Sequence, residues 1–155
     1  YLVQCAQRLG YNPEIILAGR RMNDGMGAYV VDQTIKHMLK KGIQVLHSNI
    51  LIMGFTFKEN CPDVRNTRVV DIFHALREYN VNVTVYDPWA NPTIVEHEYG
   101  IEVVNELPNQ IFDACIAAVS HKKFDGLDIL AILKEKHVVF DVKCMLDRNI
   151  VDGRL

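Results

Sequence analysis

Two cationic side chains follow a short apolar stretch near the middle of the chain. Residues 50–53 are apolar and end at Gly54, and the loop behind them carries Lys58 and Arg65. A lysine acts as a point charge toward a phosphate or carboxylate, whereas an arginine presents a planar fork that grips two oxygens. The pair indicates a site for an anionic ligand. An equally favoured interpretation is a solvated loop whose charges pair with one another, because most exposed ion pairs contribute little.

If the loop after Gly54 binds an anion, its side chains and not its backbone amides must make the contacts. It lacks the pattern G-x-G-x-x-G, so a pyrophosphate cradle of backbone amides is not supported. Asp63 precedes Arg65 by two residues and is placed to orient the arginine fork. We expect a helix to begin behind it, at Asn66 or Thr67.

Three polar residues stand at the ends of later predicted strands. Asp87 is favoured as the initiator of an Asp-Pro turn over a ribose-binding acid. His121 and Lys143 follow two further apolar strands, so both could lie at the same sheet edge as Lys58. Taken singly, His121 is expected to be structural, whereas a binding and a structural role are weighed equally for Lys143.

The elements that position these residues alternate between strand and helix from Ile43 onward. The predicted strands span 50–53, 81–85, 101–104, 114–119 and 138–142, and the predicted helices after the first strand end at Asn80, span 91–100, and span 127–135. This alternation implies parallel strands with right-handed crossovers, and therefore an α/β fold with a Rossmann-like doubly wound parallel sheet. The fully apolar stretch 114–119 fits a central strand covered on both faces.

The first 42 residues are expected to be helical. One helix spans 2–9, and a second spans 13–41 because residues 12–14 (Asn-Pro-Glu) have the pattern of a helix N-terminus. Gly25 and Gly27 are expected to break the second helix in two, since a glycine costs about 1 kcal/mol relative to alanine in a helix interior. Such a long helix is typical of a contact with another domain or subunit.

Composition limits the classes of function. The 155 residues, 49% of them apolar, suffice for the core of one domain with a piece of another, and we place the boundary between 1–42 and 43–155. A net charge of -2 makes nucleic acid a poor partner, and no apolar run approaches the roughly 20 residues that span a bilayer.

The 4 cysteines form no C-x-x-C pair, so no metal site is expected, and reduced thiols in a cytoplasmic protein are the simpler interpretation. Cys5 and Cys115 are expected in the core.

Four segments occur together in a fixed order. Residues 20–24 have the form R-x-x-N-D, residues 54–65 the form G-x-x-F-K-x-x-x-x-D-x-R, residues 86–88 the form Y-D-P and residues 141–143 the form D-x-K. In order and spacing this set resembles the nucleotide-sugar 6-dehydrogenases, the UDP-glucose/GDP-mannose dehydrogenase superfamily. The resemblance covers essentially the whole chain.

The resemblance implies that the chain is the C-terminal piece of a longer enzyme. Tyr1 and Leu2 resemble the residues just after the family's catalytic segment G-G-x-C-x-x-x-D-P, so the nucleophilic cysteine is expected before Tyr1 and no catalytic residue within the chain. The full enzyme would oxidise the C6 hydroxyl of a UDP-sugar to a carboxylate with two NAD molecules, through a cysteine-bound thiohemiacetal. The piece alone would be inactive. Residues 1–42 would end the central dimerisation region, and 43–155 would form the UDP-sugar-binding domain.

The resemblance also assigns binding residues. Lys58 and Lys143 would contact the UDP-sugar substrate, and Arg65 would reach NAD held by the N-terminal domain. Arg20 would reach the substrate site of a neighbouring subunit in a homodimer or larger homo-oligomer, with Arg21 beside it as the alternative.

Three short segments indicate a particular branch of the family. Residues 86–89 (Y-D-P-W) and 141–143 (D-V-K) followed by 146–148 (L-D-R) look closest to the bacterial UDP-N-acetylhexosamine 6-dehydrogenases of capsule and O-antigen synthesis. The alternative function is a non-catalytic α/β nucleotide-binding or dimerisation module.

Overall fold

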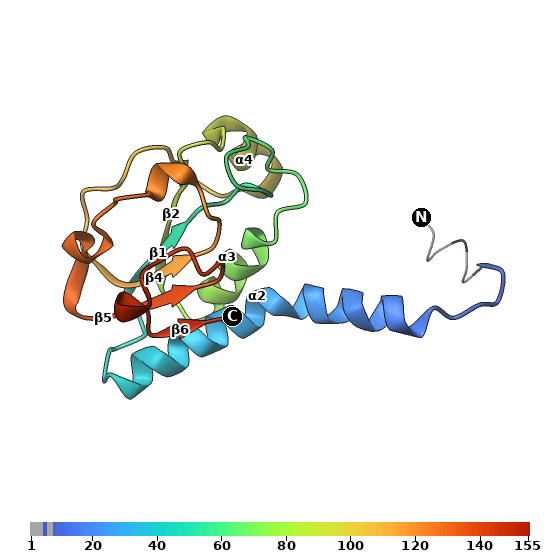
Figure 1. The fold of residues 1–155 in the computed structure, drawn as a ribbon, viewed down its shortest axis with the longest axis horizontal. Coiled ribbons are helices and arrows are strands. Elements are labelled where there is room, and N and C mark those ends of the chain that lie inside the picture. The colour runs from blue at the N-terminus through green and yellow to red at the C-terminus, as the bar shows by residue number, and fades with distance from the viewer. Residues whose placement is uncertain (1–4, 6–7) are drawn as a thin grey trace.

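The structure, a computed structural model, describes residue 5 and residues 8–155. A parallel sheet organises this part of the chain. Within it a 6-stranded sheet has the order β3-β2-β1-β4-β5-β6 (Figure 1). The strands are β1 (Asn49–Met53), β2 (Asn82–Tyr86), β3 (Val103–Val104), β4 (Phe112–Ala117), β5 (Leu133–Asp141) and β6 (Gly153–Arg154). All adjacent pairs are parallel, which confirms the predicted doubly wound sheet. The strand order reverses between β1 and β4.

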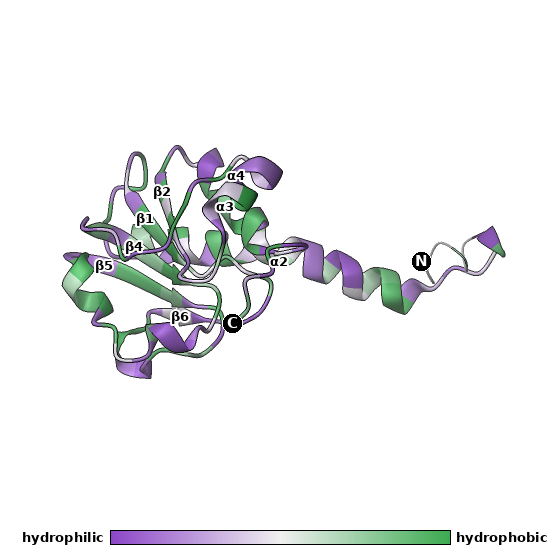
Figure 2. Ribbon diagram, turned by 90° about the horizontal axis from the view of Figure 1, so that it is seen from above, coloured by the Kyte–Doolittle hydropathy of each residue, from purple (hydrophilic) through white to green (hydrophobic). Residues whose placement is uncertain are grey.

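Different kinds of helix cover the two faces of the sheet. The α-helices are α2 (Glu14–Lys40), α3 (Val69–Glu78) and α4 (Pro92–Tyr99), and the short 3-10 helices are η1 (Lys122–Phe124), η2 (Ile129–Ile132) and η3 (Arg148–Ile150). Because successive strand residues point to opposite faces, Ile50 and Ile52 share one core with Met38 of α2, whereas Leu51 and Met53 share the other with residues of η1 and η2. Figure 2 shows apolar residues concentrated along the central strands.

Helix α2 is continuous over 27 residues, so the prediction that Gly25 and Gly27 would break it is wrong. Gly27 is buried where α2 crosses α3, and a Cβ there would lie 2.7 Å from the Cβ of Asp71. The missing side chain lets the two helix backbones approach closely. Packing against α3 therefore offsets the intrinsic cost of a glycine in a helix.

The close approach at Gly27 leads to a test with a matched control. Gly27→Ala is expected to lower the free energy of unfolding by about 1–3 kcal/mol, because the new methyl group meets the backbone of α3. Gly25→Ala meets nothing within 4 Å and is expected to raise it by about 0.5–1 kcal/mol through better helix propensity. Urea unfolding of both variants measures the difference. Equal effects would show that the contact with α3 is unimportant.

The segment between β4 and β5 differs from its prediction. The expected helix over 127–135 is wrong: only η2 forms, and β5 already begins at Leu133, which pairs with Phe112 of β4. Pairing with a buried strand outweighs the helical spacing of the apolar residues. Strand β6 was not expected, and α3 begins at Val69, later than Asn66 or Thr67.

Helix α2 has two different halves. Its C-terminal half contributes Val30, Val31, Ile35 and Met38 to the core, whereas its N-terminal half extends away from the sheet (Figure 1).

Most of the helix expected over 2–9 lies outside the described residues. Cys5 is exposed, which corrects its expected place in the core; Cys115 is buried as predicted. No helix of the described residues is long and apolar enough to cross a bilayer. The boundary near Gly42 stays a prediction.

Candidate functional site

A cavity of about 280 Å³ lies at the carboxyl edge of the sheet, where the strand order reverses. It is lined by residues 56–59 after β1, 67–69 at the start of α3, 118–119 after β4 and 142–143 after β5, with part of α2 as a further wall. Ligands of open α/β sheets bind in this position, outside the carboxyl ends of the strands at the switch point.

Lys58 and Lys143 both line this cavity, although they follow different strands. Both are exposed, and neither ammonium group pairs with a carboxylate among the described residues. Arg68 lines the cavity too, but its guanidinium is already paired with Asp24 and Asp71. The two lysines are therefore the cations that remain available to an anion in the cavity.

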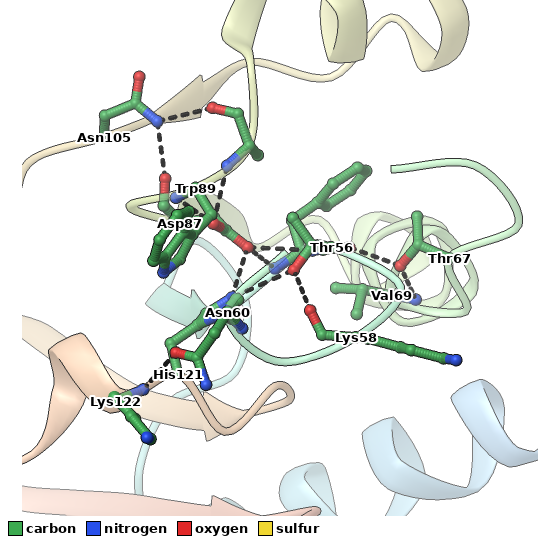
Figure 3. Close-up of polar contacts among 12 residues, drawn as sticks. Thr56, Lys58, Asn60, Thr67, Val69, Asp87, Trp89, Asn105, His121 and Lys122 are labelled. Atoms are coloured by element: carbon green, nitrogen blue, oxygen red, sulfur yellow. Dashed lines mark hydrogen bonds and ion pairs between the residues drawn. The ribbon is translucent and has the colours of Figure 1, made fainter. Parts of the chain in front are cut away.

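The loop that carries Lys58 turns sharply at Gly54, whose φ of 88° lies in the left-handed region. The next two amides, of Phe55 and Thr56, donate to Oδ2 of Asp87 at 2.6 and 3.0 Å. The Thr56 hydroxyl then donates to the carbonyl oxygen of Lys58 at 2.9 Å (Figure 3). The backbone of this loop is thus attached to the end of β2.

Asp87 is fully buried and initiates its own turn, as predicted. Its Oδ1 accepts from the amides of Trp89 and Ala90 at 2.7 and 2.9 Å. Burial by itself raises the pKa of this carboxyl, but hydrogen bonds from His121 and from the surrounding amides outweigh it and lower the pKa to about 2. Asp87 is therefore a buried carboxylate with a full set of donors, and the ribose-binding alternative does not fit it.

His121 lies behind the loop and is only 1% exposed. Its Nε2 is 3.0 Å from Oδ2 of Asp87 and 3.2 Å from the Thr56 hydroxyl, and its Nδ1 accepts from the amide of Asn60 at 2.9 Å. Because Nδ1 must offer a lone pair, the proton sits on Nε2 and the ring is neutral. His121 thus has the expected structural position and does not line the cavity with Lys58.

The turn that carries Lys143 has a separate anchor. Asp141, fully buried at the end of β5, accepts from the amides of Lys143, Met145 and Leu146 at 3.2, 3.2 and 2.9 Å. Arg154 of β6 lies 3.4 Å from the same carboxylate and balances its charge. Each cavity lysine therefore lies in a loop or turn that is held by a different buried aspartate.

Arg65 and Arg20, the other predicted binding residues, do not line this cavity. The Arg65 side chain is 75% exposed, and its Nε and Nη2 donate to the two oxygens of Asp63 at 2.9 and 2.8 Å. Asp63 thus orients the fork as expected, and these hydrogen bonds lower the pKa of Asp63 to about 2. Arg20 lies on the projecting half of α2, in a depression shared with Arg21 and Asp24.

Sequence reasoning missed the residues that support the site from behind. Thr56 and Asn60 make the contacts that attach the Lys58 loop, and Asp141 those that attach the Lys143 turn. For Asp141 the sequence offers its place at the end of a predicted strand and its part in the D-x-K pattern, but neither indicates that it holds the turn.

The described residues do not build a dinucleotide site of their own. The turn after β1 contains the single Gly54, and the position of a ribose-binding acid is taken by Asp87, whose two oxygens already accept from four amides and His121. No group of three potential metal ligands occurs in the described part of the chain.

A doubly wound parallel sheet with free cations at its switch point defines a Rossmann-like α/β domain of the nucleotide-binding class. Comparison with family models narrows the class. Residues 51–148 match the UDP-binding domain of the UDP-glucose/GDP-mannose dehydrogenase family, and the chain belongs to this family.

Whole-chain relatives agree with this assignment. The chain is 51% identical to the UDP-N-acetyl-D-glucosamine 6-dehydrogenase of Pseudomonas aeruginosa and 50% identical to that of Salmonella typhi; each match covers 100% of this chain and 37% of the relative. The chain thus spans about a third of the length of these curated relatives. Its fold matches the NDP-N-acetyl-D-galactosaminuronic acid dehydrogenase of Methanosarcina mazei with a TM-score of 0.79 at 20% identity, over 90% of this chain and 31% of that one.

Proposed function

We propose that this chain is the UDP-sugar-binding part of an NAD-dependent UDP-N-acetylhexosamine 6-dehydrogenase of surface polysaccharide synthesis. The observation that carries the proposal is the convergence of Lys58 and Lys143 on one cavity in a domain of this family. The names of the Pseudomonas aeruginosa and Salmonella typhi relatives support the N-acetylhexosamine substrate. The whole enzyme oxidises the C6 hydroxyl to a carboxylate, with its nucleophilic cysteine outside these 155 residues.

Lys58 and Lys143 bind the anionic groups of the UDP-sugar in this proposal. Both are flexible point charges on anchored turns, so domain closure can bring them onto a diphosphate without rebuilding the backbone. Arg65 serves NAD held by another domain. Its Nη1 has no hydrogen-bond partner among the described residues, and its exposed position suits a ligand arriving from outside this sheet.

A second copy of the chain is the proposed protein partner. The projecting half of α2 exposes apolar side chains, among them Ile15 at 89% and Met22 at 71%, and exposed apolar side chains along one helix favour an interface. Arg20 lies between them and would reach the neighbouring subunit's substrate site. The same surface favours the second candidate function, a non-catalytic dimerisation module.

Titration with UDP by calorimetry separates the two functions. UDP is expected to bind the chain weakly, and Lys58→Ala and Lys143→Ala are each expected to weaken binding about 10-fold, since a charge-assisted hydrogen bond contributes roughly 1.5–3 kcal/mol. Lys36→Ala removes an exposed lysine of α2 that pairs with Asp32 and is the matched control, with unchanged affinity expected.

Two outcomes of the UDP titration would contradict the proposal. The absence of binding heat from a folded, dimeric chain would favour the dimerisation module. Equal affinities of Lys58→Ala and the unaltered chain would remove the assigned role of Lys58.

A further inference from the structure

We propose that His121 is a positioning residue for Lys58: with Asp87 it holds the loop of residues 55–60, the Lys58 loop, so that the lysine faces the cavity. The proposal rests on the proposed function, in which Lys58 binds the UDP-sugar. Neither His121 nor Asp87 lines the cavity itself, so both act through the loop.

The start of the Lys58 loop is attached to Asp87. The amides of Phe55 and Thr56 donate to one oxygen of this fully buried carboxylate, and the Thr56 hydroxyl continues the chain of contacts to the carbonyl of Lys58. The residues before Lys58 are therefore held by three hydrogen bonds, of which the two to Asp87 are buried and the one to the Lys58 carbonyl is partly buried.

The end of the Lys58 loop is attached to His121. Nδ1 of the ring accepts from the amide of Asn60 at 2.9 Å, and the Asn60 side chain accepts from the amide of Lys122, the next residue after His121, at 2.9 Å. Asn60 has a φ of 56°, an uncommon conformation for a residue other than glycine, which these two contacts stabilise. Lys58 thus lies between two attached ends, and in Figure 3 its side chain extends away from the network.

The Lys58 loop is held by the polar atoms of the His121 ring, and not by the space that the ring fills. Its ring is almost completely buried and stacks edge-on with Phe124 at 5.2 Å between centroids, so an apolar ring would fill the same space. The imidazole accepts at Nδ1 from the Asn60 amide and donates at Nε2 to Asp87, and a phenylalanine ring offers neither contact. Fixing a binding group in this way lowers the entropic cost of placing it on a ligand.

The position of Lys143 is independent of this device. Its turn follows β5, is held by Asp141 and Arg154, and shares no hydrogen bond with His121. A change at His121 is therefore expected to act on binding through Lys58 and to leave the contribution of Lys143 intact.

A double-mutant cycle with UDP calorimetry on the 155-residue chain tests the proposal. His121→Phe is expected to weaken UDP binding about 5-fold in the unaltered chain and by less than about 2-fold in the Lys58→Ala background, because the positioned group is then absent. In the Lys143→Ala background it is expected to cost about 5-fold again. A loss that merely reflects a less stable fold would be the same in all three backgrounds.

Two further variants separate the contacts. His121→Asn places an acceptor near the position of Nδ1 and is expected to restore affinity to within about 2-fold, whereas His121→Gln keeps a donor toward Asp87 without that acceptor and is expected to behave like His121→Phe. His121→Gln also replaces His121→Phe in the cycle if the latter does not fold. Equal losses in every background overturn the positioning role alone, whereas an unchanged affinity of Lys58→Ala also removes the role that the proposed function assigns to Lys58.

Discussion

Replacing Gly54 with alanine is expected to lower the free energy of unfolding by about 3 kcal/mol or more. Gly54 has a φ of 88°, and a Cβ there would lie 2.5 Å from the Cβ and 2.9 Å from the backbone nitrogen of Val119. The variant combines left-handed strain of about 1–2 kcal/mol with overpacking of about 1–3 kcal/mol against a neighbouring strand end that cannot move aside easily. Chemical denaturation followed by circular dichroism measures the loss.

Gly126→Ala is the matched control for this variant. Gly126 has a similar φ of 77°, but a Cβ there would meet nothing within 4 Å, so only the strain of about 1–2 kcal/mol is expected. If both variants lose the same free energy of unfolding, the close approach of Gly54 to Val119 does not restrict which residue the turn after β1 can accept.

Asp87→Asn is expected to cost about 3 kcal/mol of unfolding free energy at neutral pH. The amide is isosteric with the carboxylate, but its nitrogen cannot accept the hydrogen bonds that the replaced oxygen accepts, so buried donors lose their partner. Asp32→Asn changes an exposed carboxylate that pairs with Lys36 and is the control, with a change below about 0.5 kcal/mol expected.

The acid dependence of unfolding gives Asp87 a distinct signature. Because folding lowers the pKa of Asp87 from 3.8 to about 2, the associated stability is complete above pH 3.8 and is lost as the pH falls toward 2. The shift corresponds to about 2 kcal/mol. Urea unfolding between pH 5 and pH 2 is expected to show a larger acid loss in the unaltered chain than in Asp87→Asn, which keeps the acid-sensitive pair of Asp63 and Arg65 but lacks the contribution of Asp87. The same acid loss in both would contradict the assignment.

Much of the fold and the residue types of the site follow from local patterns in the sequence. The period-two and helical spacings predict the alternation of strand and helix after Ile43, and the alternation implies the parallel sheet. The glycine that ends β1, the Asp-Pro turn at Asp87 and the helix start at Asn91 are turn signals that need no tertiary context, and each is where the sequence predicts it.

The tertiary structure decided how these pieces meet. Helical spacing predicts a helix over 127–135, but pairing of Leu133 with Phe112 makes its end a strand. Gly25 and Gly27 carry the same local cost, and it is offset by the packing of α2 against α3 and β5, with which the helix makes tertiary contacts. Local propensities amount to about 1 kcal/mol per residue, so burial against a distant element overrides them.

The sequence by itself determined the family motif, the parallel sheet and the identity of Lys58 and Lys143 as candidate cations for one edge. Only the tertiary structure decided that the two lysines share one cavity while Arg65 and Arg20 lie elsewhere, because that depends on strand order and on which side chains an ion pair occupies. The tertiary structure also shows that Asp87, which the sequence predicts only as a turn residue, accepts hydrogen bonds from a loop that is distant in sequence. Such a role arises when folding buries a carboxylate beside amides remote in sequence, and no local pattern encodes it.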